Sequence, residues 1–217
     1  MAEKVTIPIS FFEYTGEYTR PLLGALMERA RIVQAVFDAL APWGLEIDNV
    51  DPITTGKASE QGVNFRLPGK RCAFFFGASL CRLTKDDANW ATAEELIAIL
   101  TAALQSLRRA SGAEISKQKT SLALHLQPRS MSFLEILRPF LSSRLMELDT
   151  SGIRTGASIV KWESRKVTLD GSGALANAVF LRLERDFGSE ETFEEIAVQI
   201  RDDEIAIFNM LNVEEEP

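Results

Sequence analysis

His125, the single histidine, is the first side chain to consider for catalysis or metal binding, because imidazole transfers protons near neutral pH and ligates metals. It stands in the segment TSLALHLQP, on the side opposite the leucines. No cysteine or second histidine has metal-ligand spacing, whereas a structural metal site needs about four ligands. No serine occupies a G-x-S-x-G turn, and no cysteine-nucleophile signature is present. The sequence therefore assigns no catalytic residue and no metal ligand, and His125 is interpreted as a sheet histidine.

Motifs for phosphate or cofactor binding are also missing. The glycines at Gly152 and Gly156, and at Gly171 and Gly173, match neither a P-loop nor a dinucleotide fingerprint, so they are interpreted as turns. Paired carboxylates such as Glu94-Glu95 and Glu190-Glu191 fall at expected helix starts, where the helix dipole favours negative charge. We predict no cofactor.

The overall charge argues against nucleic acid as a partner. The chain has 24 basic and 31 acidic side chains, which gives a net charge of -7. Basic residues gather at Arg108, Arg109, Lys117 and Lys119, but no aromatic side chains interleave with them to stack on bases. A local basic patch that contacts an acidic protein partner is the favoured interpretation.

Aromatic residues are unusually dense around Phe74-Phe75-Phe76, with Phe65 upstream and Trp90 downstream. Consecutive phenylalanines on a strand place large rings on both faces, and each face then needs a cover. Core packing, an oligomer interface and an apolar ligand cavity all remain open as explanations. The candidate interface or ligand-facing residues are Phe65, Phe74, Phe76, Trp90 and His125.

The hydrophobic pattern predicts the elements that must position these residues. Strands are expected where apolar residues alternate or cluster between turn signals, at 4–14, 45–50, 63–67, 71–83, 115–127, 153–162, 164–169 and 176–186. Amphipathic helices are expected at 19–40, 92–112, 132–148 and 190–211. Thr92 with Glu95, and Ser132 with Glu135, have the spacing of capping boxes.

The order of these elements is β-α-β-β-β-α, given twice. We therefore predict an α+β fold built as a tandem repeat, with halves 1–112 and 113–217 packed as one body about a pseudo-twofold axis. The sheets are expected to be mainly antiparallel, with helices packed on one face. Each half alone would be a marginal domain, and packing two halves together buries more apolar surface.

Cys72 and Cys81 both fall in the expected strand 71–83. If that strand is continuous, nine steps of about 3.3 Å separate them, which is beyond the reach of a disulfide. Their opposite parity directs them to opposite faces unless Gly77 marks a bulge. Buried, reduced thiols are expected. With no apolar run of membrane-spanning length and no signal-peptide pattern, the chain is interpreted as a soluble cytoplasmic protein with no membrane partner.

One resemblance to a known family can be stated on these residues. Four elements of the chain resemble those of a sporadically distributed, uncharacterised bacterial family: an aromatic strand, an amphipathic helix, the strand that follows it and a C-terminal helix. The residues that carry the resemblance are Val63–Phe65, Phe74–Gly77, Leu96–Leu107, Leu122–Gln127 and Phe193–Leu211. The sequence has Leu124-His125-Leu126-Gln127 where that family is expected to carry an arginine-tyrosine-asparagine signature. The family has no established activity, so the resemblance implies no catalytic residues.

The leading hypothesis is a non-enzymatic protein-interaction or accessory module that binds a protein partner or a second copy of itself, as a homodimer. It follows from the scattered polar chemistry and the surplus of aromatic strand surface. The alternative is a small-molecule binding protein, or an enzyme with few sequence signals, that uses a cavity between helices and sheet, with polar groups such as His125 or Arg182 directed inward.

Overall fold

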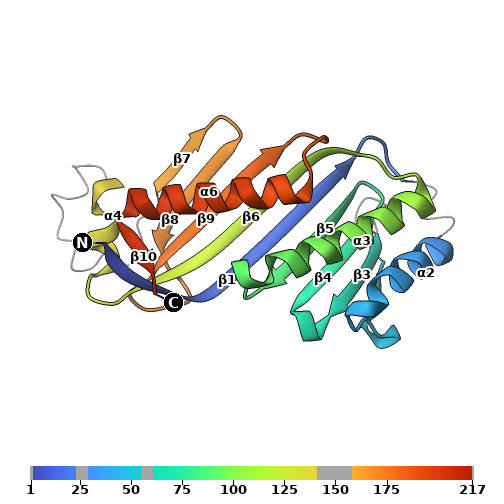
Figure 1. The fold of residues 1–217 in the computed structure, drawn as a ribbon, viewed down its shortest axis with the longest axis horizontal. Coiled ribbons are helices and arrows are strands. Elements are labelled where there is room, and N and C mark those ends of the chain that lie inside the picture. The colour runs from blue at the N-terminus through green and yellow to red at the C-terminus, as the bar shows by residue number, and fades with distance from the viewer. Residues whose placement is uncertain (1, 23–28, 55–60, 141–157, 217) are drawn as a thin grey trace. The chain divides into compact units, whose positions relative to one another are not determined.

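The computed structural model describes residues 2–22, 29–54, 61–140 and 158–216 (Figure 1). Strands in antiparallel pairs are covered by helices, which confirms the α+β class. The chain forms two compact units: unit 1 comprises Met1–Phe11, Ser121–Arg185 and Ala197–Pro217, and unit 2 comprises Phe12–Thr120 and Asp186–Ile196. These units cut across the predicted halves 1–112 and 113–217. The internal repeat with its pseudo-twofold axis stays a prediction.

Two long strands contribute to both units: β1 (Glu3–Tyr18) and β6 (Ile115–Pro128). Each was predicted, although β1 extends four residues beyond the expected end at Tyr14. Alternation along β6 is as expected, with Leu122, Leu124 and Leu126 buried on one face.

Unit 2 is a sheet with two helices on one face. Its strands follow the hydrogen-bonded order β2-β3-β4-β5-β1. The remaining elements of this unit are β2 (Val50–Ile53), β3 (Gly62–Leu67), β4 (Cys72–Gly77), β5 (Leu80–Asp86), α2 (Arg29–Leu40) and α3 (Ala93–Ser111). The first part of the predicted helix 19–40 includes residues 23–28, which lie outside the described residues.

The predicted continuous strand 71–83 is wrong, because these residues form the antiparallel hairpin β4–β5. The chain reverses after Gly77, where a Cβ atom would lie only 2.9 Å from the carbonyl oxygen of Gln61. A glycine allows this close approach of two backbones. The reversal also brings Cys72 and Cys81 to the same, buried face of the sheet, contrary to the predicted opposite faces. Their register offset of four residues leaves them about 13 Å apart, and both are free thiols.

Two further local predictions are corrected. Residues 45–50 do not form a strand: a 3-10 turn occupies Ile47–Asn49, because aspartate and asparagine favour turns, and β2 starts only at Val50. Thr92 and Glu95 do not form a capping box: the Thr92 hydroxyl donates to the Asn89 carbonyl, and Glu95 accepts from Lys70 at 2.5 Å. The predicted box of Ser132 with Glu135 is confirmed.

Unit 1 also contains a sheet, with strands in the order β1-β6-β9-β8-β7 and β10 paired parallel to β1. Its further elements are α4 (Phe133–Leu137), β7 (Ser158–Trp162), β8 (Arg165–Gly171), β9 (Val179–Phe187), α6 (Phe193–Leu211) and β10 (Val213–Glu215). The first four residues of α6 belong to unit 2. The predicted helix through Leu148 and the start of the predicted strand 153–162 lie partly outside the described residues.

The first residues of β1 are held by a charged side chain. The Glu3 carboxylate accepts from the Ser130 backbone N–H at 2.6 Å, from the Ser130 hydroxyl at 2.6 Å and from the Met131 N–H at 3.1 Å. These bonds favour the ionised form and lower the pKa of Glu3 below its ordinary value of 4.5. Glu3 therefore ties β1 to the loop that follows β6.

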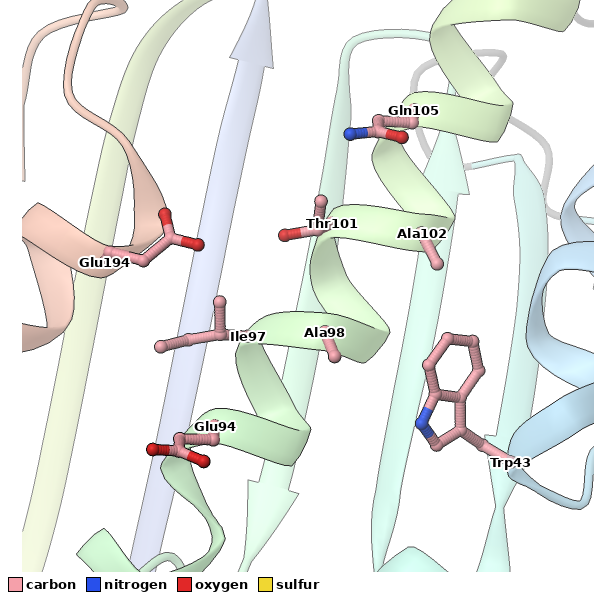
Figure 2. A pocket seen from close by; sticks show the side chains of 8 residues that line it. All are labelled: Trp43, Glu94, Ile97, Ala98, Thr101, Ala102, Gln105 and Glu194. Atoms are coloured by element: carbon pink, nitrogen blue, oxygen red, sulfur yellow. The ribbon is translucent and has the colours of Figure 1, made fainter.

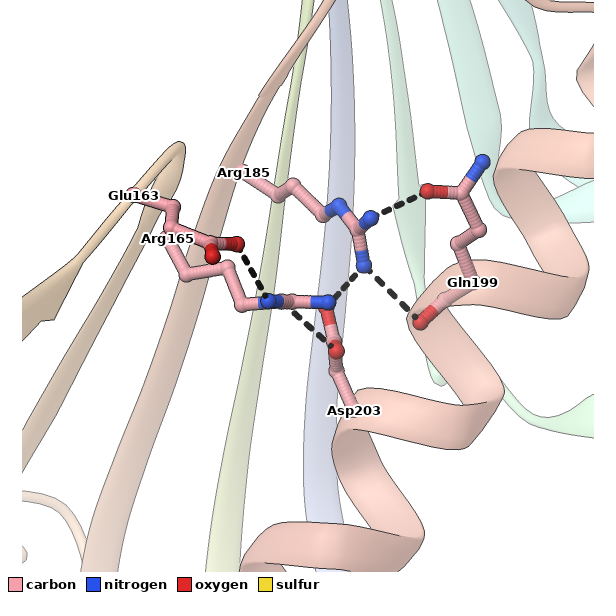
Figure 3. A network of polar contacts seen from close by, with 5 residues as sticks. All are labelled: Glu163, Arg165, Arg185, Gln199 and Asp203. Atoms are coloured by element: carbon pink, nitrogen blue, oxygen red, sulfur yellow. Dashed lines mark hydrogen bonds and ion pairs between the residues drawn. The ribbon is translucent and has the colours of Figure 1, made fainter.

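A charged cluster joins α6 to the sheet of unit 1 (Figure 3). Asp203, only 7% exposed, accepts from Arg165 Nε at 2.9 Å and from Arg185 Nη1 at 2.6 Å. Arg165 also pairs with Glu163, and Arg185 donates to the backbone carbonyl and side chain of Gln199. One carboxylate on α6 thus bridges β8 and β9, which fixes the rotation of the helix about its axis.

The Glu3 contacts predict a pH-dependent contribution to stability. Because the folded-state pKa of Glu3 is lowered, its carboxylate stabilises the fold above the ordinary pKa and loses this effect as the pH falls through the folded value. We expect Glu3→Gln to lower the Tm at pH 7, and the Tm values of variant and parent to converge as the pH falls through the lowered folded-state pKa of Glu3. Glu214→Gln is the control, because its ion pair with Lys4 is exposed; a loss of equal size in that variant contradicts the assignment.

Removal of the Asp203 carboxylate leaves two arginines without a shared partner. Asp203→Ala is expected to reduce the free energy of unfolding by about 3 kcal/mol, the usual cost of breaking a buried ion pair. Asp202→Ala, the neighbouring exposed position on α6, is the matched control and is expected to change it by less than about 0.5 kcal/mol. Urea unfolding of the two variants measures both values, and equal effects would rule out the bridging role.

Candidate functional site

Phe65, Phe74 and Phe76 lie in the core of unit 2. They are at most 2% exposed and pack beneath α2 and α3, where the rings of Phe65 and Phe76 stack with centroids 5.9 Å apart. Phe75 points to the opposite face of the sheet, is half-buried and lies 5.7 Å from the Arg82 guanidinium. Core packing therefore accounts for the first three rings, and Phe75 is the one that reaches the helix-free face.

Trp90 and His125 lie apart from that core. Trp90 begins the 3-10 turn that leads into α3 and is half-buried. His125 lies on β6 in unit 1, with Nδ1 2.7 Å from Ser172 Oγ and its ring 5.2 Å from that of Phe180. Partial burial lowers the pKa of His125 below 6.5, because desolvation disfavours the charged form.

The pair of His125 and Ser172 stabilises a turn. Ser172 Oγ accepts from the backbone N–H groups of Ala174 and Leu175, so its own proton is directed to His125 Nδ1. A hydroxyl held by three hydrogen bonds in this way fixes the loop between β8 and β9. We assign it no nucleophilic role.

A shallow groove runs over the outer surface of α3 in unit 2 (Figure 2). Trp43 borders it on one side and Glu194, at the start of α6, on the other, with Ala98 and Ala102 directed toward Trp43. The groove has a volume of about 460 Å³, and its lining residues are Trp43, Glu94, Ile97, Ala98, Thr101, Ala102, Gln105 and Glu194. The groove forms because α3 carries the small side chains of Ala98 and Ala102 on its outer surface, between the larger side chains of Trp43 and Glu194.

Glu194, the acidic border of the groove, is positioned by buried polar groups. The Tyr14 hydroxyl donates to Gln118 Oε1 at 2.9 Å, and Gln118 Nε2 donates to the carbonyls of Gly188 at 2.8 Å and Glu191 at 3.0 Å. Phe193 then packs edge-to-face on Tyr14, with ring centroids 5.3 Å apart. These contacts fix the segment before α6, and thereby place Glu194 beside the groove.

A capping box completes the start of α6. The Thr192 hydroxyl accepts from the Glu195 N–H, while the Glu195 carboxylate accepts from the Thr192 N–H at 2.8 Å. The bonds to Thr192 lower the pKa of Glu195. This box was not among the predicted capping boxes, although its T-x-x-E spacing is present in the sequence.

The groove over α3 was not predicted from the sequence either. The only signal was on α3, whose outer face carries Ile97, Ala98 and Ala102 where a solvated helix normally has charged residues. Trp43 and Glu194 are far apart in the chain, and no local pattern places them on either side of that helix.

Among the described residues, no group of three or more histidine, cysteine or carboxylate side chains is arranged to hold a metal ion. None of the helices in the described ranges combines the length and apolar character that a membrane span requires. Neither a scan against protein-family models nor a comparison with curated proteins finds a match for this chain. The resemblance to an uncharacterised bacterial family stays a prediction.

The two cysteines are expected to be unreactive in the folded protein. Burial raises the pKa of Cys72 to about 11 and that of Cys81 to about 12, so the nucleophilic thiolate is scarce near neutral pH. We expect neither thiol to react with a disulfide reagent at pH 8 within minutes, and both to react after denaturation. Rapid labelling of the native protein would contradict the buried placement.

Proposed function

We propose that this protein is a non-enzymatic interaction module that binds a segment of a protein partner in the groove over α3. The observation that carries the proposal is the open, largely apolar surface between Trp43 and Glu194. The surface of a helix that faces only water is normally polar. The outer surface of α3 instead carries the half-buried Ile97, and Ala98 and Ala102 leave room for a side chain from a partner.

Charge defines the chemistry of the partner. Glu94 and Glu194 both border the groove and are exposed, and they lie in the first turns of α3 and α6 respectively. A segment with apolar side chains for the groove and lysine or arginine beside them would bury apolar surface and gain ion pairs. An amphipathic helix with a basic flank has this pattern, and helix-in-groove binding is a common mode of peptide recognition.

The groove suits a protein segment better than a small molecule. Its volume of about 460 Å³ is within the range of ligand pockets, but those usually enclose most of the ligand surface, and this one is open. The alternative of a cavity between helices and sheet, lined by His125 or Arg182, gains little support. Arg182 lies on the face of β9 opposite the residues that face α6, and His125 contacts Phe180 on that same face.

Two synthetic helical peptides test the proposal. They share one leucine stripe, and one carries lysines beside the stripe where the other carries glutamates. We expect the lysine peptide to bind about fivefold more tightly by fluorescence anisotropy, because each exposed ion pair contributes about 0.5 kcal/mol. In NMR spectra its binding is expected to shift the amide signals of Ile97, Ala98, Thr101 and Ala102.

Charge reversal supplies the control. The double variant Glu94→Lys/Glu194→Lys is expected to invert the preference between the two peptides, and this ratio does not depend on the stability of the variant. The matched variant Glu17→Lys/Glu46→Lys changes the net charge equally at exposed positions outside the groove and is expected to retain most of the lysine preference. Equal binding of both peptides, or shifts confined to other surfaces, would refute the proposal.

A further inference from the structure

β7 is the outermost strand of unit 1 (Figure 1). It pairs on one side with β8, from Ser158 opposite Leu169 to Trp162 opposite Arg165, and no other strand within the described ranges pairs with it. Two of its apolar side chains are exposed, Ile159 at 59% and Val160 at 39%. A strand with unpaired backbone groups and exposed β-branched residues is a template for pairing with another chain.

The outer strand of unit 2 is less suited to such pairing, although its Ile53 is also exposed, at 36%. β2 has four residues, and Pro52 in its middle carries no backbone N–H. Proline on an outer strand is a common device that prevents edge pairing. β7 reads Ser-Ile-Val-Lys-Trp and contains no proline. The two outer strands therefore differ in their capacity to accept another strand.

The hairpin geometry shows which groups of β7 face outward. Glu163 and Ser164 form a two-residue turn, so the flanking pair of Trp162 and Arg165 exchanges backbone hydrogen bonds. Because hydrogen-bonded and non-hydrogen-bonded pairs alternate in an antiparallel ladder, Val160 also bonds to β8. The N–H and C=O groups of Ile159 and Lys161 consequently point to the free edge.

We propose that a second copy of this chain pairs antiparallel with β7, with Val160 of each copy on the twofold axis. In this register Ile159 lies opposite Lys161 of the second copy, and the two residues exchange backbone hydrogen bonds on both sides of the axis. Val160 lies opposite its own counterpart in a non-hydrogen-bonded pair, where side chains are closest. All outward-facing backbone groups of Ile159 and Lys161 gain partners.

Charge and strand length favour this register over axes at the two neighbouring residues, Ile159 and Lys161. A twofold axis at Lys161 places two lysines directly opposite each other, which is destabilising in a strand pair. An axis at Ile159 pairs fewer of the described residues, because Lys161 then lies opposite position 157, which is outside the described ranges. With the axis at Val160, the aliphatic part of Lys161 packs beside Ile159 and its ammonium reaches water.

Sedimentation equilibrium over a range of concentrations tests the pairing. We expect the parent protein to dimerise reversibly, and Val160→Lys to remain monomeric because it places two ammonium groups on the axis. Val198→Lys is the matched control, since Val198 is 60% exposed on α6, and it is expected to dimerise like the parent. Parent protein that stays monomeric at every concentration, or a Val160→Lys variant that dimerises equally, would overturn the proposal.

A charge-swap mixture identifies the register. Val160→Lys and Val160→Glu are each expected to be monomeric, and their equimolar mixture to form a heterodimer, because opposite charges then meet on the axis. A mixture that stays monomeric contradicts the Val160 register. Pairing of β7 with a strand from another protein would leave both single variants and the parent monomeric, which also contradicts self-pairing.

A cross-link gives an independent measurement. Cα atoms in a non-hydrogen-bonded antiparallel pair lie about 4.5 Å apart, which a disulfide can span. Val160→Cys is expected to form a reducible covalent dimer under mild oxidation, whereas Val198→Cys is not, and the native Cys72 and Cys81 are buried. Equal cross-linking of both variants would overturn the proposal. Peptide binding over α3 is measured separately, so failure of either proposal leaves the other standing.

Discussion

The structure of unit 2 depends on one buried amide. Gln118 is 3% exposed, and its side chain needs partners for both ends, because an unsatisfied buried amide costs about 1–3 kcal/mol. Tyr14 supplies the donor, and the carbonyls of Gly188 and Glu191 supply the acceptors. Hydrophobic burial alone would allow α6 to begin at several positions. These directional bonds select a single starting position for α6, and that position places Glu194 at the border of the groove.

A related principle applies to unit 1. Apolar residues of α6 such as Ile200 and Ile207 face the sheet, but apolar contact is non-directional and tolerates rotation of the helix. The carboxylate of Asp203 prevents such rotation, because it is held by an arginine from β8 and an arginine from β9. In each unit taken by itself, apolar side chains provide most of the burial, and a small set of buried polar groups determines which arrangement is adopted.

The fold was predictable from the sequence where the pattern is periodic. The helix Ala93–Ser111, the alternating strand Ile115–Pro128 and the box at Ser132 all carry their signals within a few residues. The hairpin at Gly77 was not predictable, because the apolar run of β4 continues almost directly into Leu80 and Cys81 of β5, and the turn between them lacks an asparagine-glycine or proline signal. The groove and the Gln118 contacts join residues that are distant in the chain, so only the folded structure brings them together.

The interleaved composition of the units has a consequence for synthesis on the ribosome. Unit 2 needs residues 186–196, and unit 1 combines the first eleven residues with residues 197–217. Residues 186–196 are synthesised well after the other residues of unit 2, and β10, which pairs with β1, is synthesised after β5 and β6, the other neighbours of β1. Until residues 186–196 follow, the Gln118 side chain lacks the carbonyls of Gly188 and Glu191 that accept its hydrogen bonds. The last hydrogen bonds of unit 2 therefore form only after its strands and its two helices have been synthesised.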